Sequence, residues 1–174
     1  MPTKIMRLCR NSRMDSAGFA LGELLMIIVV ISILAVIGFP MYLSYMRAQE
    51  TDSAARVLVV SLNQARQFAV TQGVSYSVET QTDPNNQMRA CSGTAVPCPG
   101  GNVYTGAGTD TAGWRKLENG SRFTLGPAIT FSSLGAATAA GTLRVQNSSA
   151  TGSLDVCVSP SGRIKVQAPA AACP

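Results

Sequence analysis

A single carboxylate, Glu23, lies at the start of an apolar run that extends from Leu24 to Phe39. A charged side chain inside a membrane segment costs about 2.5–3.5 kcal/mol, so it is rarely there by accident. The chemistry open to such a carboxylate is pairing with an ammonium group, because two opposite charges in lipid offset each other's desolvation. Glu23 is therefore the first candidate functional residue.

The residues before Glu23 indicate proteolytic processing. A short basic leader carries Lys4, Arg7, Arg10 and Arg13. A secretory signal peptide is cut after its apolar region, next to small residues. Here the small residues Ala17 and Gly18 come before the apolar run. A cut after Gly18 would remove the basic leader and leave an apolar helix that begins at Phe19.

This pattern resembles the class III leader of type IV prepilins and type II secretion pseudopilins. Residues 18–23 read GFALGE, and the family consensus is close to GFTLIE. The resemblance implies that a prepilin peptidase cleaves after Gly18 and methylates Phe19. It also implies that Glu23 pairs with the terminal amine of a neighbouring subunit, and that Pro40 is a helix-bending proline. An ordinary signal anchor with a chance glutamate is the alternative.

The apolar span is long enough to cross a bilayer, which takes about 20 residues. Basic residues are concentrated before it, so the positive-inside rule leaves the leader in the cytoplasm and the C-terminal domain in the periplasm. The resemblance implies an inner-membrane protein that later joins a pilus or pseudopilus filament. The net charge of +5 falls to about +2 without the leader, whose four basic residues and one acidic residue contribute +3. The overall charge is therefore no evidence for nucleic-acid binding.

Four cysteines remain beyond the leader, all in the part expected outside the cytoplasm, where disulfides persist. They are Cys91, Cys98, Cys157 and Cys173. Four cysteines allow three pairings. We favour Cys91–Cys98 and Cys157–Cys173, because each pair closes a short local loop. Zinc is the competing reading, but the spacings are not C-x-x-C and the chain has no histidine. No cofactor or metal is expected.

The helical pattern continues beyond Pro40. Small and apolar residues recur at steps of three and four between Ala54 and Ala69, with polar residues on the other side. Gly73 is a typical residue for ending a helix. We therefore expect one helix from about Phe19 to Gln72, about 80 Å long at 1.5 Å per residue. Its first half is apolar all round, and its second half has one apolar stripe that suits a sheet.

From Val74 onward the sequence reads as short strands between loops rich in Gly, Pro, Asn and Asp. The expected strands are Val74–Thr80, Trp114–Leu117, Arg122–Leu125, Ile129–Ser132, Thr142–Gln146, Leu154–Val158 and Arg163–Gln167. A helix packed on an antiparallel sheet domain is an α+β architecture. The expected organisation is a leader at 1–18, an assembly helix at 19–40, an amphipathic continuation at 41–73 and a β-rich domain at 74–174.

Three segments of the β-rich part resemble the GspH/FimT branch of the pilin-like superfamily. They are Gly113-Trp114, Ile129-Thr130-Phe131 followed by Gly135, and the hairpin VCVSPSGRIKV at 156–166. The resemblance implies a pilin fold and a minor type IV pilin that primes or caps pilus assembly. A type II secretion minor pseudopilin is the alternative. The implied partners are other pilin or pseudopilin subunits, the prepilin peptidase and the inner membrane, with no small-molecule substrate.

The same hairpin carries another functional hypothesis. In some FimT-type proteins a G-R-x-R segment binds DNA for uptake, and residues 162–165 here read GRIK. On a strand, Arg163 and Lys165 project from one face. Two such cations suit successive phosphates, with Arg144 as a third candidate contact, and the binding would be salt-sensitive and independent of sequence. The alternative is a solvated edge strand whose basic residues discourage aggregation.

Little in the sequence supports an enzyme. The lack of histidine excludes Ser-His-Asp and Cys-His nucleophile pairs. The carboxylates of the β-rich part are scattered over separate loops and strands, with no pairing for acid–base work. We therefore expect a subunit that acts by assembly or binding.

Overall fold

The computed structural model describes residues 21–171 and residue 173. In these residues one α-helix, α1 (Leu21–Gln72), precedes nine strands. The chain divides into two compact units between Met41 and Tyr42, within α1. The expected leader at 1–18 lies outside the described residues and remains a prediction.

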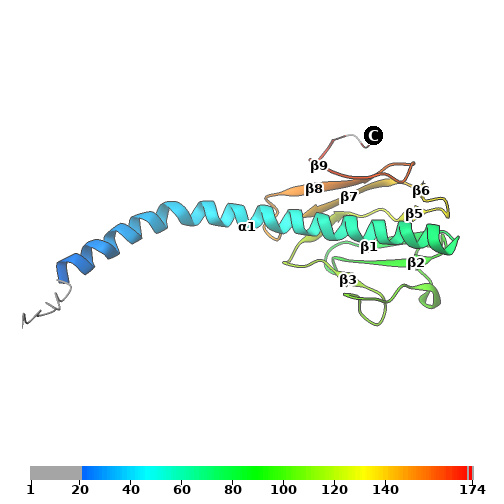
Figure 1. Cartoon of the computed structure of the whole chain (residues 1–174), viewed down its shortest axis with the longest axis horizontal. Coiled ribbons are helices and arrows are strands. Elements are labelled where there is room, and N and C mark those ends of the chain that lie inside the picture. Colours follow the sequence, from blue (N-terminus) through cyan, green and yellow to red (C-terminus); the bar gives the residue numbers. More distant parts are fainter. Residues whose placement is uncertain (1–20, 172, 174) are drawn as a thin grey trace, which may run out of the picture. The chain divides into compact units, whose positions relative to one another are not determined.

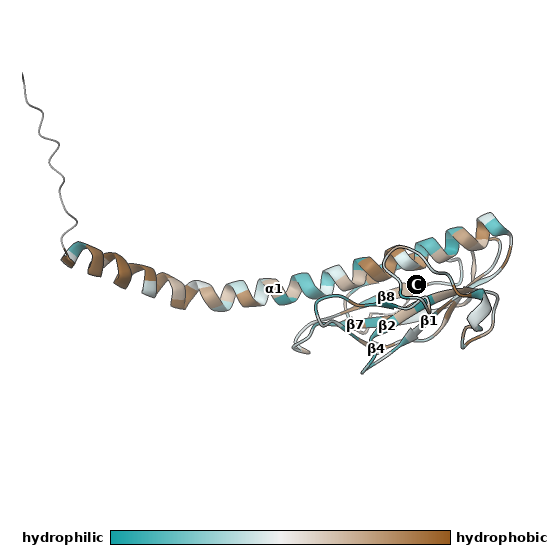
Figure 2. Cartoon of the chain, turned by 90° about the horizontal axis from the view of Figure 1, so that it is seen from below, coloured by the Kyte–Doolittle hydropathy of each residue, from teal (hydrophilic) through white to brown (hydrophobic). Residues whose placement is uncertain are grey.

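The first unit consists, in its described part, of the apolar beginning of α1. Its side chains are all exposed, and the helix is mostly brown in Figure 2 after its first turn. The hydroxyl of Ser32 donates a hydrogen bond to the carbonyl oxygen of Ile28 (2.7 Å), which satisfies the polar group within the helix. Pro40 lies inside α1, where its ring nitrogen has no proton to donate to Val36. Among the described residues, α1 is the one helix long and apolar enough to cross a membrane.

The later part of α1 packs its predicted stripe into the core of the second unit. The buried helix residues are Thr51, Ala54, Ala55, Leu58, Leu62, Ala65 and Ala69. Their three- and four-residue spacing follows the helical period, and the many alanines let strands approach the helix closely. Phe68, on the same side of the helix, is half-buried and packs against Tyr104 with tilted rings whose centroids are 4.8 Å apart. Gly73 ends the helix with φ +69°, a left-handed conformation that suits glycine.

Two antiparallel sheets lie against this part of α1 (Figure 1). The five-stranded sheet has the order β3-β2-β1-β5-β6, with β1 Tyr76–Gln81, β2 Gln87–Ser92, β3 Arg115–Lys116, β5 Ile129–Phe131 and β6 Ala137–Ala139. The four-stranded sheet has the order β4-β7-β8-β9, with β4 Arg122–Leu125, β7 Gly141–Gln146, β8 Ser153–Val158 and β9 Ile164–Gln167. A short 3-10 helix, η1 (Gly100–Asn102), lies between β2 and β3. The α+β prediction is confirmed, with two sheets where the sequence indicated one.

Two strands were missed from the sequence. β2 (QMRACS) is mixed in polarity, yet it pairs with β1 along its whole length, from Gln87 opposite Gln81 to Ser92 opposite Tyr76. β6 lies in a run of small residues that reads as a loop, and it pairs with β5. Both strands exist because a neighbouring strand presents a matching edge, which a local sequence pattern does not reveal.

The core of the second unit lies between α1 and the two sheets. Its largest fully buried side chains include Phe123, Phe131, Leu58, Leu62, Met88, Ile129 and Leu143. Burying a side chain of this size contributes about 1.5–3 kcal/mol. These residues come from α1 and from both sheets, so the core holds the helix and the sheets together.

Candidate assembly and nucleic-acid surfaces

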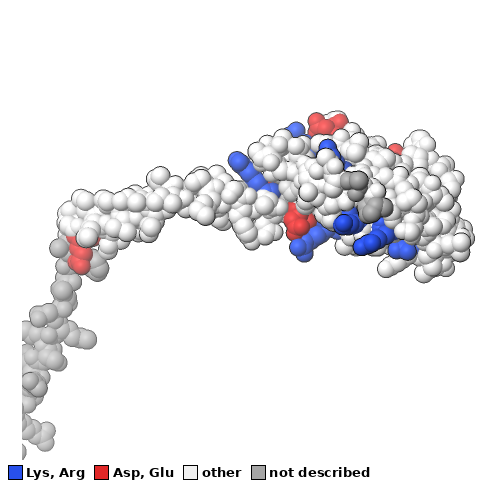
Figure 3. Space-filling model, turned by 90° about the horizontal axis from the view of Figure 1, so that it is seen from above, with Lys and Arg blue, Asp and Glu red and all other residues white. Residues whose placement is uncertain are grey.

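The assembly candidate is the beginning of α1. Glu23 lies in the first described turn, where a carboxylate interacts favourably with the helix dipole. Residues 24–46 carry no charge, and all of them are exposed; this uncharged segment is white in Figure 3. Within the described residues Glu23 forms no ion pair. Gly18 and Phe19, the expected cleavage and methylation sites, lie outside the described residues.

The nucleic-acid candidate is the β8–β9 hairpin at one edge of the four-stranded sheet. Lys165 lies opposite Cys157, and Ile164 lies opposite Val158. Arg163 and Lys165 are exposed, whereas Ile164 between them is half-buried against the core. Neither cation forms an ion pair within the part of the chain that the structure describes. Several Lys and Arg side chains lie close together on the face of the second unit that Figure 3 shows.

A close approach of two turns positions this hairpin. Gly162 has φ +78°, and a Cβ there would overlap the carbonyl oxygen of Gly135 in the β5–β6 turn. The same carbonyl accepts a hydrogen bond from Nε of Arg66 on α1 (2.9 Å). The backbone N–H of Ala137 also donates to the carbonyl of Pro160 (3.0 Å). The hairpin turn, the β5–β6 turn and α1 therefore meet at one point.

This meeting point adds a cation that the sequence analysis missed. Nε of Arg66 lies 3.3 Å from the position of a Cβ on Gly162, the residue next to Arg163. In the sequence Arg66 is one of several polar residues on the outer side of a helix, 97 positions before Arg163. No periodicity or spacing could have linked the two.

Arg144, the third expected DNA contact, is already engaged. Its Nε and Nη2 donate to the two carboxylate oxygens of Asp155 at 2.6 and 2.9 Å. The hydrogen bond from Arg144 holds the pKa of Asp155 below its usual range, against the opposing effect of desolvation, and a backbone hydrogen bond from Ala170 acts in the same direction. The Asp155 side chain is 2% exposed, so this pair is a structural contact. The expectation that Arg144 extends the basic pair is therefore not supported by its geometry.

The cysteines are paired as favoured from the sequence. Cys91–Cys98 and Cys157–Cys173 are both disulfides, with Cα–Cα distances of 5.8 and 5.6 Å. The backbone N–H of Cys98 donates to Oε2 of Glu79 (3.0 Å), and Nη2 of Arg89 donates to the Cys98 carbonyl (3.2 Å). Arg89 also pairs with Glu79 and lies 4.3 Å from the ring centroid of Trp114. The first disulfide loop is thus tied to the five-stranded sheet.

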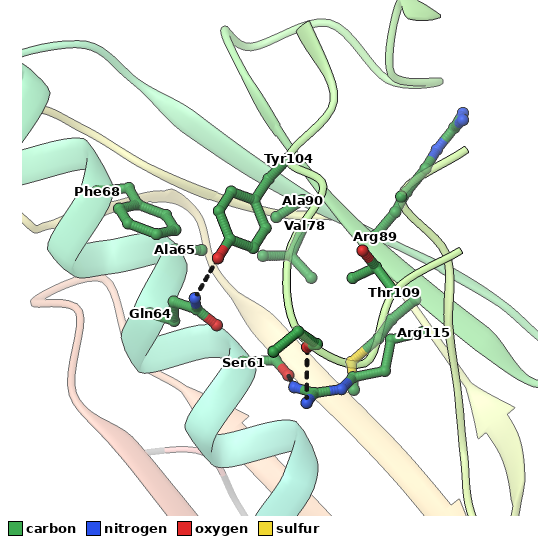
Figure 4. A pocket seen from close by; sticks show the side chains of 13 residues that line it. Ser61, Gln64, Ala65, Phe68, Val78, Arg89, Ala90, Tyr104, Thr109 and Arg115 are labelled. Carbon is green, nitrogen blue, oxygen red and sulfur yellow. Dashed lines mark hydrogen bonds between the residues drawn. The ribbon is translucent and has the colours of Figure 1, made fainter. Parts of the chain in front are cut away.

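A small cavity lies between α1 and the loop before β3 (Figure 4). Gln64 donates to the hydroxyl of Tyr104 (3.0 Å), and Arg115 donates to the hydroxyl of Ser61 (3.3 Å). Its volume of about 30 Å³ has room for ordered water but not for an organic substrate. Among the described residues, no group of His, Cys, Asp or Glu is arranged to hold a metal ion.

The family model described as "Type II transport protein GspH" matches residues 54–162. This chain belongs to the GspH family. The match runs from the buried stripe of α1 to the glycine at the hairpin turn, so it includes the whole helix-to-sheet core. No curated protein matches the GspH-family chain in sequence.

Solved structures give the fold of this GspH-family chain independently. It is similar to the type IV minor pilin FimU of Pseudomonas aeruginosa, with 19% identity, a TM-score of 0.50, and 72% of this chain and 97% of that chain covered. It is also similar to the minor pseudopilin EpsH from the type II secretion system of Vibrio cholerae, with 19% identity, a TM-score of 0.51, and 70% and 99% covered. The chain therefore has the pilin fold of a minor pilin or pseudopilin.

Proposed function

We propose that this GspH-family chain is a minor type IV pilin that primes or caps pilus assembly. The observation that carries the proposal is the uncharged segment at residues 24–46, which is exposed on every side and follows the single carboxylate of Glu23. So much contiguous apolar surface requires lipid or other subunits to cover it. The second unit has a core of its own, to which residues 24–46 contribute no buried side chain.

In the proposed mechanism the chain is first inserted in the inner membrane, with its β-rich domain in the periplasm. The prepilin peptidase cleaves after Gly18 and methylates Phe19. During assembly, Glu23 pairs with the terminal amine of a neighbouring pilin subunit, because the carboxylate and the ammonium are each costly alone in an apolar environment. The subunit acts by this pairing and by helix packing, without catalysis and without a small-molecule substrate.

The test is incorporation of Glu23→Ala into filaments. We expect the variant to be cleaved normally and to be depleted about tenfold or more from sheared filaments, because an unpaired ammonium would remain in the helix core. Ser32→Ala is the matched control, since it removes a polar group from the same segment. The Ser32 hydroxyl donates its hydrogen bond to the carbonyl oxygen of Ile28 within the helix, so it needs no partner from another subunit. Normal incorporation of Glu23→Ala would refute the pairing.

Cleavage is tested separately with Gly18→Phe. A bulky residue at the cleavage position should leave a precursor that stays in the membrane and runs at the uncleaved mass. A mature-sized product from this variant, identified by N-terminal mass spectrometry, would refute cleavage after Gly18.

The alternative is a type II secretion minor pseudopilin with the same assembly mechanism. The GspH family match supports it, and the likeness to EpsH equals the likeness to FimU. The two machines are distinguished by deleting the chain in its native cell and scoring surface pili and protein secretion side by side. Loss of pili with normal secretion supports the pilus; the opposite result supports the secretion system.

A second candidate function is binding of DNA at the hairpin. It is supported by the exposure of Arg163 and Lys165, and by the contact of Arg66 with the adjoining turn at Gly162 and Gly135. Phosphate contacts of this kind would bind any sequence and weaken as salt rises. Lysine at 165 supplies charge without the bidentate geometry of arginine, which predicts weaker binding than two arginines would give.

The experiment is a gel-shift titration of the full chain in detergent with duplex DNA at several salt concentrations. Arg163→Gln/Lys165→Gln should weaken binding and reduce the slope of log K against log salt by about two. Lys116→Gln/Arg122→Gln is the control, because it removes the same charge from exposed residues of β3 and β4. Equal loss in both variants would indicate general charge attraction, and no binding at low salt would leave the assembly role alone.

A further inference from the structure

The C-terminal residues lie on the outer face of the four-stranded sheet. In β8 the side chain of Val156 belongs to the core, so its neighbours Asp155 and Cys157 point to the opposite face. Both are nevertheless buried, at 1% and 0% exposure. They are in contact with the residues that follow β9. We call Ala168–Ala171 together with Cys173 the strap.

Three contacts hold the strap on the sheet. The backbone N–H of Ala170 donates to Oδ2 of Asp155 (3.1 Å), the side chain of Gln167 donates to the carbonyl of Ala171 (2.6 Å), and Cys173 is bonded to Cys157. Ala170 has φ +64°, a conformation that non-glycine residues rarely adopt. Such a conformation persists only where the surroundings enforce it. The strap therefore depends on these attachments.

The two disulfides differ in the access that they offer to a reductant. Cys91 and Cys98 are both buried, at 0% and 6% exposure. Cys157 is fully buried as well, but its partner Cys173 is exposed. Thiol–disulfide exchange requires a thiolate to reach one of the two sulfur atoms. Of these four cysteines, Cys173 is the one that a folded chain presents for attack.

We propose that Cys157–Cys173 is a reducible clasp, which a dithiol reductant opens by attack on Cys173, and that opening it releases the strap. The attacking thiolate bonds to the sulfur of Cys173 as the S–S bond breaks, and Cys157 leaves as a thiolate that takes up a proton. The second thiol of the reductant then attacks the mixed disulfide and frees the Cys173 thiol. Two electrons reach this chain, and the reductant ends as a disulfide.

Opening the clasp changes the surface beside the hairpin. Cys157 lies directly opposite Lys165 in the β8–β9 register, so the uncovered area adjoins the exposed basic residues. Release of Ala170 also removes one hydrogen bond from the carboxylate of Asp155. The clasp therefore controls which groups this face presents to a partner. The inference holds for a pilus or a secretion subunit and does not depend on the proposed function.

The first experiment measures which disulfide is reduced in the folded chain. The full chain in detergent is treated with one maleimide to block free thiols, exposed to dithiothreitol without denaturant, and quenched with a second maleimide of different mass. We expect peptides containing Cys157 and Cys173 to be labelled about tenfold or more faster than those containing Cys91 and Cys98. Equal labelling rates for the two disulfides, or faster labelling of Cys91 and Cys98, would overturn the proposal.

The second experiment measures release by amide hydrogen exchange at Ala170 and Ala171. Exchange should accelerate in Cys157→Ser/Cys173→Ser and stay unchanged in Cys91→Ser/Cys98→Ser, the matched control. If the first variant fails to fold, the same exchange is measured on wild-type chain after selective reduction, with the core amides as an internal check of folding. Unchanged protection of the strap with an intact core would refute the release.

Discussion

At the scale of single residues, Gly162 and Gly135 have a packing role. Both belong to segments that resemble the GspH/FimT branch, and both have positive φ. A Cβ on Gly162 would overlap the carbonyl oxygen of Gly135. The same carbonyl oxygen accepts a hydrogen bond from Arg66 on the helix. The glycines therefore let two turns touch. This contact also fixes the backbone of the hairpin turn immediately before Arg163.

Gly162→Ala tests this packing role. The variant combines an unfavourable φ with an overlap, so we expect it to lower the free energy of unfolding by about 2 kcal/mol or more. Gly73→Ala is the control, because Gly73 has φ +69° with open space around its Cβ position. Both are measured by thermal unfolding of the full chain in detergent. Equal destabilisation would mean that backbone conformation, rather than the overlap, requires Gly162.

At the scale of elements, the four-stranded sheet is stabilised on its outer face by charge. Arg144 of β7 and Asp155 of β8 lie directly opposite each other in the register, and the strap adds a hydrogen bond to the same carboxylate. Because Asp155 is nearly inaccessible to water, its ionised form depends on these partners. The pair joins two strands and the C-terminal strap into one unit.

This arrangement predicts a pH dependence of stability. The pKa of Asp155 is lower in the folded chain than in the unfolded chain, where it is about 3.9. Its stabilising contribution is therefore complete above about pH 4 and is lost as the pH falls through the lower folded value. Asp155→Asn should lower stability at pH 7 and flatten the loss of stability below pH 4.

Thermal unfolding between pH 7 and pH 3 measures this effect. Asp52→Asn is the control, since its carboxylate is 45% exposed and pairs with Arg56, which is 78% exposed. We expect the control to change stability by less than about 1 kcal/mol at any of these pH values. An identical pH profile for wild type and Asp155→Asn would show that the pair contributes nothing to acid stability.

At the scale of the whole molecule, the described chain separates the surface that we propose for assembly from the folded core. Every buried residue of α1 lies at or after Thr51, and all the strands follow it. The uncharged segment at 24–46 contributes no buried side chain. The fold of the second unit therefore does not need the apolar half of the helix.

A fragment from Ala48 to Pro174 should accordingly fold without detergent. We expect a single cooperative unfolding transition, and Leu62→Ala should cost about 2–5 kcal/mol in both the fragment and the full chain, because its cavity lies in the same core. Val60→Ala, at a 59% exposed position, should change stability by less than about 0.5 kcal/mol. A fragment that lacks cooperative unfolding would show that the core requires the preceding helix.

Local pattern was sufficient for much of this protein. The sequence by itself determined one helix to about Gln72, the change of that helix from apolar on all sides to apolar on one side, and most of the strands. It favoured the disulfide pairs that the structure contains, without excluding the other pairings. These features follow from periodicity, turn residues and short cysteine spacings, which act over a few residues. The carboxylate at Glu23 was identified from its place at the start of an apolar run, and the two cations of the hairpin from the resemblance to FimT-type proteins. Their roles in assembly and DNA binding remain predictions.

Only the tertiary structure decided which distant residues meet. It formed β2 and β6 by pairing with strands that present a matching edge, and it divided the strands between two sheets. It brought Arg66 within hydrogen-bond distance of Gly135, which is 69 positions away in the sequence. It also paired the guanidinium of Arg144 with the carboxylate of Asp155. It also placed the C-terminal strap against the outer face of the four-stranded sheet, where the strap contacts Asp155 and Cys157. These contacts depend on how packing brings separate elements together, a property that no local stretch of the sequence contains.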